Sequence, residues 1–400
     1  MPFEAKPAGL YLSIPFCKHK CSFCNFASDV FSNALLDRYI DRLCIEIRDA
    51  RAKAHSRGAI LPNHLDTIYF GGGTPSLLAP AHLNRIFATI RDGFELNPAA
   101  EITLEAAPDQ LLPETLEVAQ REGVNRISFG VQSFIDRESA AVGRTHTAAS
   151  CHAEIVRLRA SGIENISLDL IAGLPYQTQQ SWAASLDQAI ATATDHISIY
   201  LLEVDEDSRL GRESLAGGPR YHAPALPPED DTADWYQAAC TQLADVGIHQ
   251  YEISNFARPG RQSRHNRKYW QRDPYLGVGL DAHSMLHCHD GTAIRWANPD
   301  AMSAYLPTGD LPILPTALKI DRIAQDQAFE ESLFLGLRLN EGVDLNHLST
   351  QFGEARLNQA LSAVEDIAFA GLIARSGSRL SLTPSGRLAS NEVFSRLLVA

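Results

Sequence analysis

The fold of this protein is decided by one stretch of its sequence, YLSIPFCKHKCSFCNF, at residues 11–26. It begins within an apolar run, Leu10–Ile14, which predicts a buried β-strand, and the cysteines Cys17, Cys21 and Cys24 follow at once. Three thiolates on one short loop can bind three irons of a [4Fe–4S] cluster, and no fourth cysteine is nearby to complete the set. One iron of such a cluster would therefore stay open.

An open iron could chelate the amino and carboxylate groups of S-adenosylmethionine. An electron from the cluster could then cleave the sulfonium of that cofactor to a 5′-deoxyadenosyl radical. The spacing alone leaves two other interpretations open, which are a zinc site with His19 as fourth ligand and three incidental thiols.

Length and composition describe an ordinary globular protein. The chain has 400 residues, of which 45% are hydrophobic and 21% charged, enough for two or three domains or one large barrel with an appendage. Its formal net charge of -13 argues against a general attraction to nucleic acid or an anionic membrane. No run reaches the roughly 20 apolar residues of a membrane span, and no secretory signal is visible. We therefore expect a cytoplasmic protein, in which crowded cysteines indicate metal binding rather than disulfides.

Strand and helix patterns alternate up to about residue 203. Segments with helical period separate six short apolar or alternating runs, and stripes such as Leu83, Ile86, Phe87 and Ile90 mark these helices. The predicted strands are 10–14, 66–70, 101–105, 126–132, 167–171 and 196–202. Six βα units predict an α/β fold with an incomplete (β/α)6 TIM-like barrel, and an open doubly wound sheet is the competing topology.

The remainder of the chain predicts an extension and a second unit. Residues 205–231 are rich in Gly, Pro and charge and predict a long surface excursion, followed by a helix over 230–246. Two further apolar runs, 250–257 and 275–286, could extend or cover the sheet. We expect residues 1–300 to form the barrel with its extension. Residues 319–400 should form a helical, winged-helix-like domain that serves as a lid or interface rather than a DNA-binding module.

Polar residues interrupt the predicted strands near their carboxyl ends. Alternation along the strands turns Glu105, Gln132 and Asp169 toward the inside of the barrel, away from their apolar neighbours. A barrel rim that gathers such groups is a site for a polar ligand, because burying them unpaired costs several kcal/mol. The residues Gly71–Thr74 end the second predicted strand, where glycines would let the backbone approach a cofactor.

The sequence carries further motifs in a characteristic order: YFGGGTPS, RISFGVQSF, GRTH, ISLDLIAGLP, ISNFARPG and HNRKYW. Together with the cysteine segment, they resemble the radical S-adenosylmethionine superfamily. Within it, they are similar to the oxygen-independent coproporphyrinogen III oxidase group and its heme-chaperone branch. The resemblance implies a [4Fe–4S] cluster on Cys17, Cys21 and Cys24, an electron donor such as flavodoxin or ferredoxin, and one or two bound S-adenosylmethionine molecules. The implied contacts to that cofactor are Tyr11, Phe23, Gly72, Gly73, Thr74, Glu105, Gln132, Arg144 and Asp169.

Two features separate this chain from the oxidases. Those enzymes have an additional cysteine two positions after the third, whereas here Cys24 is followed by Asn25 and Phe26. The segment HNRKYW, residues 265–270, instead resembles the HNxxYW signature of the heme-chaperone branch. The resemblance therefore implies a protein that binds heme and passes it to an apo-hemoprotein. The alternative is an enzyme that oxidatively decarboxylates the propionate side chains of coproporphyrinogen III.

The segment from Arg258 to Arg272 has six basic residues and no acidic one. Heme propionates could pair with these cations, Tyr269 and Trp270 offer stacking faces, and His265 is a potential iron ligand. A solvated basic loop with an aromatic pair in the core is the alternative interpretation. The other four cysteines, Cys44, Cys151, Cys240 and Cys288, are expected to be ordinary buried thiols. For Cys288, which lies beside His287 and His289, metal binding is the alternative.

Overall fold

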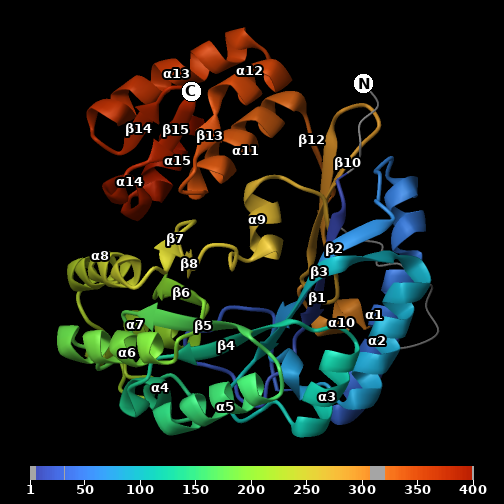
Figure 1. Cartoon of the computed structure of the whole chain (residues 1–400), viewed down its shortest axis with the longest axis vertical. Helices are drawn as coiled ribbons and strands as arrows, with labels where there is room; N and C mark the ends of the chain where they lie inside the picture. The colour runs from blue at the N-terminus through green and yellow to red at the C-terminus, as the bar shows by residue number, and fades with distance from the viewer. Residues whose placement is uncertain (1–5, 31, 307–319, 399–400) are drawn as a thin grey trace.

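The centre of the molecule is a sheet of six parallel strands that follow one another in chain order. The computed structural model describes residues 6–30, 32–306 and 320–398. The six strands are β1 (Ala8–Ile14), β2 (His64–Gly72), β3 (Glu95–Ala106), β4 (Arg126–Gln132), β5 (Asn165–Ala172) and β6 (His196–Leu201). Each strand pairs in parallel with the next, so the order never reverses as it would in a doubly wound sheet. The predicted partial barrel is confirmed (Figure 1).

The extension lengthens this sheet at both edges. On one side β9 (Tyr275–Val278) pairs in parallel with β1, and β10 (His283–His287), β11 (Ala293–Ala297) and β12 (Ile320–Ile323) continue antiparallel. On the other side β8 (Asn255–Ala257) and β7 (His249–Gln250) follow β6. The run predicted over 275–286 is two strands rather than one, because Gly279 and Asp281 turn the chain with φ of 99° and 56°.

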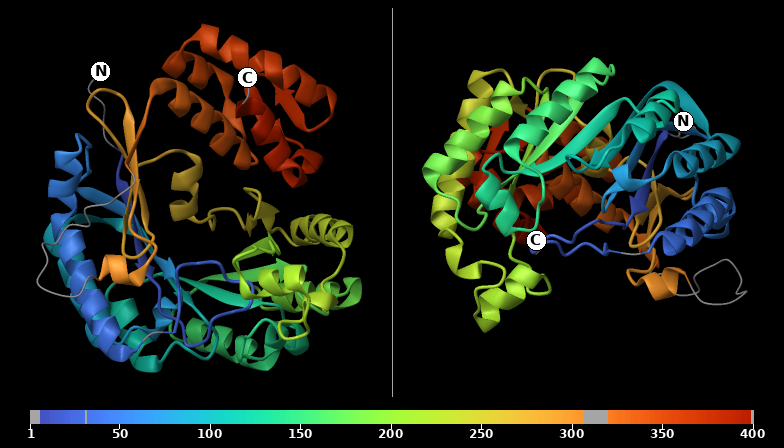
Figure 2. Two further views of the ribbon diagram at one scale, coloured as in Figure 1. Left: turned by 180° about the vertical axis from the view of Figure 1, so that it is seen from behind. Right: turned by 90° about the horizontal axis from the view of Figure 1, so that it is seen from below.

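The helices of the repeat cover the outer face of the sheet, as Figures 1 and 2 show. They are α1 (Asn33–Ser56), α2 (Pro80–Gly93), α3 (Pro113–Arg121), α4 (Asp136–Ala141), α5 (Ala148–Ala160) and α6 (Gln179–Ala191). The helix expected near 230–246 is α8 (Glu229–Asp245). The excursion before it is not all loop, since it contains α7 (Arg209–Ala216), whose first turn is capped by the Ser208 hydroxyl.

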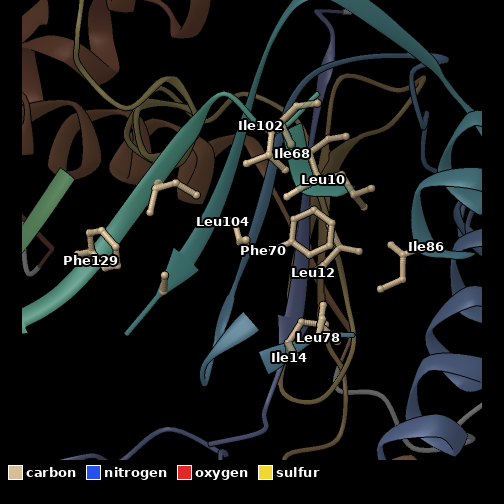
Figure 3. Close-up of a cluster of buried hydrophobic side chains, with 14 of the residues drawn as sticks. Leu10, Leu12, Ile14, Ile68, Phe70, Leu78, Ile86, Ile102, Leu104 and Phe129 are labelled. Atoms are coloured by element: carbon tan, nitrogen blue, oxygen red, sulfur yellow. The ribbon is translucent and has the colours of Figure 1, made fainter. Parts of the chain in front are cut away.

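Alternation along the strands separates the core from the barrel interior. Leu10, Leu12 and Ile14 of β1 are fully buried beside Phe70 of β2 and Leu104 of β3. Figure 3 shows these side chains packed together in the space next to α2. Residues of opposite parity, such as Tyr11 and Glu105, are left to face the interior, where the candidate site lies.

The C-terminal residues pack around a hydrophobic cluster of their own, which includes Phe329, Leu333 and Val393. The helices there are α11 (Gln325–Arg338), α12 (Leu345–Phe352), α13 (Glu354–Phe369), α14 (Pro384–Leu388) and α15 (Ser390–Leu398). A small antiparallel sheet of β13 (Val343–Asp344), β15 (Arg379–Leu382) and β14 (Ile373–Ser376) accompanies them. The boundary predicted at residue 319 lies outside the described residues.

Two features of the extension hold the C-terminal helices against the barrel. The backbone of Glu252 forms a β-bridge with that of Leu339, and the Asn340 N–H donates to the Tyr251 carbonyl at 2.9 Å. The helix α9 (Arg264–Trp270) lies between the two parts and contacts α11. Within the described part of the chain, no helix is long and apolar enough to cross a membrane.

Truncating Phe70 tests the assignment of the core. Its side chain is fully buried, and its ring centroid lies 5.4 Å from that of Phe87. Phe70→Ala should lower the free energy of unfolding by about 3–5 kcal/mol, because it removes apolar contacts and leaves a cavity. Val156→Ala, at a side chain that is 66% exposed, should change it by less than about 0.5 kcal/mol. Equal effects in chemical denaturation would show that this packing is wrong.

Candidate functional site

The site is built where the loop after β1 meets the turn after β2. We call residues 15–30 the cysteine loop and residues 71–74 the glycine turn. The Thr74 N–H donates to the Phe16 carbonyl at 2.8 Å, and a Cβ atom on Gly73 would lie 2.7 Å from the Ile14 carbonyl oxygen. Because that distance is too short for a side chain, glycine at residue 73 is what allows the two segments to touch.

The three cysteines of this loop line one cavity of about 630 Å³. Cys21 is buried, Cys17 and Cys24 are partly exposed, and all three are free thiols. The Thr74 hydroxyl donates to the Cys17 sulfur at 3.7 Å, and the Cys24 N–H donates to the Cys21 carbonyl. Burial raises the pKa of the Cys17 and Cys21 thiols, and the nearby charge of Arg144 opposes both shifts.

The donor set fits a [4Fe–4S] cluster, which takes one thiolate on each of three irons. Among the residues that the structure describes, no three His, Cys, Asp or Glu side chains converge on a single metal ion. Ligands bound to separate irons do not need to converge on one point. When bound, the cluster supplies the electron that cleaves S-adenosylmethionine to a radical.

Polar residues from β3, β4 and β5 line the same cavity beside the thiols. These are Glu105, Gln132, Asp169 and, just after α4, Arg144. Glu105 accepts a hydrogen bond from the Tyr69 hydroxyl at 2.8 Å, and burial raises its pKa to about 7. Burial also raises the pKa of Asp169, against the opposing effects of Ser198 and Arg126. The Nε atom of Arg144 is buried without a hydrogen-bond partner among the described residues, as expected of a group that awaits a ligand.

Gln132 reaches the cavity through an irregularity in its strand. The pairing of β4 with β5 shifts by one residue between Gly130 and Gln132, and Gln132 has a φ of 68°. This left-handed conformation is unusual for a residue with a side chain and is typical of functional sites. A Cβ atom on Gly130 would lie 2.9 Å from both Arg144 Nη2 and Gln132 Nε2, so glycine leaves space for both side chains.

The structure also places the remaining predicted cofactor contacts. Phe23, Gly72, Gly73 and Thr74 line the main cavity. Tyr11 instead faces an adjacent pocket of about 120 Å³ that shares Gly72 and Glu105 with the main cavity. The predicted residues are therefore brought together around two adjacent spaces that share lining residues.

Sequence reasoning missed Arg126, a buried side chain whose charge acts on Glu105 and Asp169. This side chain is 2% exposed, and its Nε atom has no hydrogen-bond partner within the described chain. Its positive charge lowers the pKa of both Glu105 and Asp169, against the larger effect of burial. The available signal was an arginine at the start of a largely apolar predicted strand. A cation buried in a barrel needs anionic neighbours, so its position could have indicated the carboxylates nearby.

His265 does not face this cavity. Its side chain is 1% exposed, its Nδ1 hydrogen-bonds to the Thr67 hydroxyl at 2.8 Å, and its Nε2 to the Tyr269 hydroxyl at 2.9 Å. Burial lowers the pKa of His265 to about 3, so the ring is neutral. Both ring nitrogens already form hydrogen bonds, so a role as an iron ligand would require one of these bonds to break.

Each of the six basic residues in the segment around α9 has an acidic partner in the structure. Arg258 and Arg261 pair with Asp195, Arg264 and Lys268 with Asp66, Arg267 with Glu341, and Arg272 with Glu331. The acidic partners come from distant parts of the chain, which is why local composition did not reveal them. Heme propionates would have to compete with these carboxylates for the cations, and binding of heme at this segment stays a prediction. Outside the site, Cys44, Cys151 and Cys288 are buried and Cys240 is partly exposed.

Comparisons with known proteins agree with this geometry. Residues 11–189 match the model of the radical SAM superfamily, and residues 323–389 match the HemN C-terminal domain. The coproporphyrinogen III oxidase HemN from Escherichia coli has a similar solved structure, with a TM-score of 0.82 and 25% identity, covering 98% of this chain and 90% of that one. The chain therefore belongs to the radical S-adenosylmethionine superfamily.

Full-length relatives define the family more narrowly. The heme chaperone HemW from Bacillus subtilis is 34% identical over 97% of this chain and 98% of its own. HemW from Lactococcus lactis is 32% identical over 98% of each chain. Within its superfamily, the protein belongs to the HemW family.

Removing the thiols tests the cluster assignment. Reconstituted wild-type protein should contain about four irons per chain, and the triple variant in which Cys17, Cys21 and Cys24 are replaced by Ala should contain almost none. Cys240→Ala, outside the site, should retain the full iron content. If the triple variant kept the iron and the visible spectrum of the wild type, these thiols would not be the ligands.

Burial of Glu105 predicts a specific pH dependence. The pKa of this carboxyl rises from its ordinary value of 4.5 to about 7 in the folded protein. Its contribution to stability is therefore complete below about pH 4.5 and is lost as the pH rises through about 7. Because Glu105→Gln lacks this loss, the unfolding free energy of the variant minus that of the wild type should increase over this window.

Chemical denaturation at a series of pH values, before cluster reconstitution, measures that difference. Glu117→Gln, at an exposed position on α3, is the matched control and should show a difference that is independent of pH. A pH-independent difference for Glu105→Gln as well would contradict the burial of an uncompensated carboxyl in the barrel.

Proposed function

We propose that this protein is a radical S-adenosylmethionine heme chaperone, which binds heme and a [4Fe–4S] cluster and delivers the heme to hemoproteins. The observation that carries the proposal is the similarity to proteins named heme chaperone HemW along almost the whole length of both chains. The proposal is also supported at residue 26, because the oxidases have an additional cysteine at this position and this chain has Phe26. Phe26 is 66% exposed at the cavity and brings no fourth thiolate to the loop.

In this proposal the residues of the cavity have separate tasks. The thiols of the cysteine loop hold the cluster, and the glycine turn holds the methionine end of S-adenosylmethionine against it. Glu105 and Asp169 offer carboxylates to the cationic groups of that cofactor, and Arg144 offers its guanidinium to anionic ones. The protein would act in the cytoplasm, take electrons from a flavodoxin or ferredoxin, and pass heme to an apo-hemoprotein.

The second candidate is the oxidative decarboxylation of coproporphyrinogen III. The similarity to HemN over 98% of this chain favours it. In this reaction the radical would remove a hydrogen atom from a propionate side chain of the substrate. Such a porphyrinogen carries no iron, so the reaction would need no heme ligand.

Two assays on the same reconstituted protein separate these functions. A chaperone should bind hemin at about one equivalent per chain, and it should leave coproporphyrinogen III unchanged under anaerobic, reducing conditions with S-adenosylmethionine. Ovalbumin, an acidic protein without a heme site, sets the level of nonspecific hemin adsorption when hemin is competed off with apomyoglobin. Turnover of coproporphyrinogen III without hemin retention above this level would replace the chaperone with the oxidase.

A further inference from the structure

The cavity extends well beyond the predicted contacts to S-adenosylmethionine. From the cysteine loop it continues past the end of β6 to α11, α14 and α15. We call this second part the outer end of the cavity. Figure 1 shows these C-terminal helices on the side of the sheet where β7 and β8 lie. Its lining comes from Tyr200, Leu201, Leu202, Glu203, Tyr236, Ile253, Ser254, Arg338, Arg387, Leu388, Ser390 and Asn391.

Arg338 is an unpaired cation in this lining. Its Nε atom is buried without a hydrogen-bond partner, and its guanidinium lies 4.3 Å from the centre of the Trp270 ring. It forms no ion pair with the described residues, although the charges of Glu252 and Glu203 raise its pKa against the larger effect of burial. Stacking on Trp270 fixes the plane of the guanidinium while leaving its edge available for an anion.

Arg387, at the other side of the outer end, is in a similar state. Its Nη1 atom donates to the Leu382 carbonyl at 3.1 Å. It forms no ion pair within the part of the chain that the structure describes. Arg338 and Arg387 thus differ from the six basic residues around α9, each of which is paired with an acidic side chain.

Apolar side chains surround these two arginines. Leu202, Ile253 and Leu388 lie in the lining between the barrel and the C-terminal helices. Tyr200 and Leu201, at the end of β6, are 42% and 37% exposed, which is high for large hydrophobic residues. Exposed apolar groups at the wall of a cavity mark a binding surface for an apolar ligand.

The combination matches one class of ligand. A tetrapyrrole presents a wide apolar ring with carboxylates on flexible arms at one edge. Arginine binds carboxylates through two parallel hydrogen bonds, and such charge-assisted bonds are the strong ones. The acidic Glu203 lies in the same lining and its charge raises the pKa of Arg338, so a propionate on Arg338 is expected at the edge of the guanidinium that faces away from Glu203.

We propose that the outer end of the cavity is the tetrapyrrole site, with the ring against Leu201, Leu202 and Leu388 and the propionates on Arg338 and Arg387. The inference rests on the proposed heme-binding function and adds the place and the groups that recognise the ligand. It places heme beside the cluster and S-adenosylmethionine in one cavity rather than at the basic segment of α9.

Hemin and its dimethyl ester, which lacks the propionate charges, are the probes. Reconstituted wild-type protein should bind hemin at least about tenfold more tightly than the ester, because only hemin can pair with the arginines. Arg338→Gln and Arg387→Gln should each weaken hemin binding by about tenfold and leave ester binding nearly unchanged. Arg375→Gln, at an exposed position of β14 outside the cavity, should bind both probes like the wild type.

Iron content and circular dichroism would verify that each variant is folded and carries its cluster. Should Arg338→Gln fail this check, Arg338→Lys, which keeps the charge but loses the planar fork, should show an intermediate affinity for hemin. Equal hemin affinity in wild type and both variants, or equal affinity of the wild type for hemin and ester, would overturn this site while the chaperone function stands. Failure of the wild type to bind hemin would instead overturn the proposed function, and this site with it.

Discussion

The contact between the glycine turn and the cysteine loop is the constraint on which the site depends. The cysteine loop must stay at a fixed distance from the barrel rim. At a different distance, the cluster and S-adenosylmethionine would not share one cavity. The Thr74 N–H sets this distance through its bond to the Phe16 carbonyl, and Gly73 permits it because a Cβ atom would meet the backbone of residues 14 and 16.

The barrel interior next to that junction contains ionisable groups whose charged forms are destabilised by burial. Glu105 and Asp169 have raised pKa values, and Arg126 is the buried cation that lowers both. Arg144 also lowers the pKa of Asp169, yet burial has the larger effect on both carboxyl groups, so further positive charge would stabilise their ionised forms. The cationic groups of S-adenosylmethionine would supply this charge, so binding of that cofactor would offset the cost of burying the two carboxyl groups.

Local patterns in the sequence predicted the helices, the strands and the cysteine loop. The partners of the charged and polar side chains could not be predicted, because they come from distant parts of the chain. The βα repeat and the spacing of Cys17, Cys21 and Cys24 act over short stretches, so the partial barrel and the cysteine loop followed directly. Ion pairs and hydrogen bonds between distant residues leave no such local pattern. Lys268 belongs to a run without acidic residues, yet Asp66 of β2 neutralises it, and Thr67 occupies a nitrogen of His265. Arg338, in contrast, gives no local signal because its significance lies in the cavity it shares with β6.

The most direct test of this account is the iron content and S-adenosylmethionine affinity of Gly73→Ala. Gly93→Ala is the matched control, because a Cβ atom on Gly93, at the end of α2, would meet nothing within 4 Å. We predict that Gly73→Ala keeps the circular dichroism of the barrel but loses most of its cluster iron and its cofactor binding, while Gly93→Ala matches the wild type. A Gly73→Ala protein with wild-type iron content and wild-type cofactor affinity would contradict the central role of this junction.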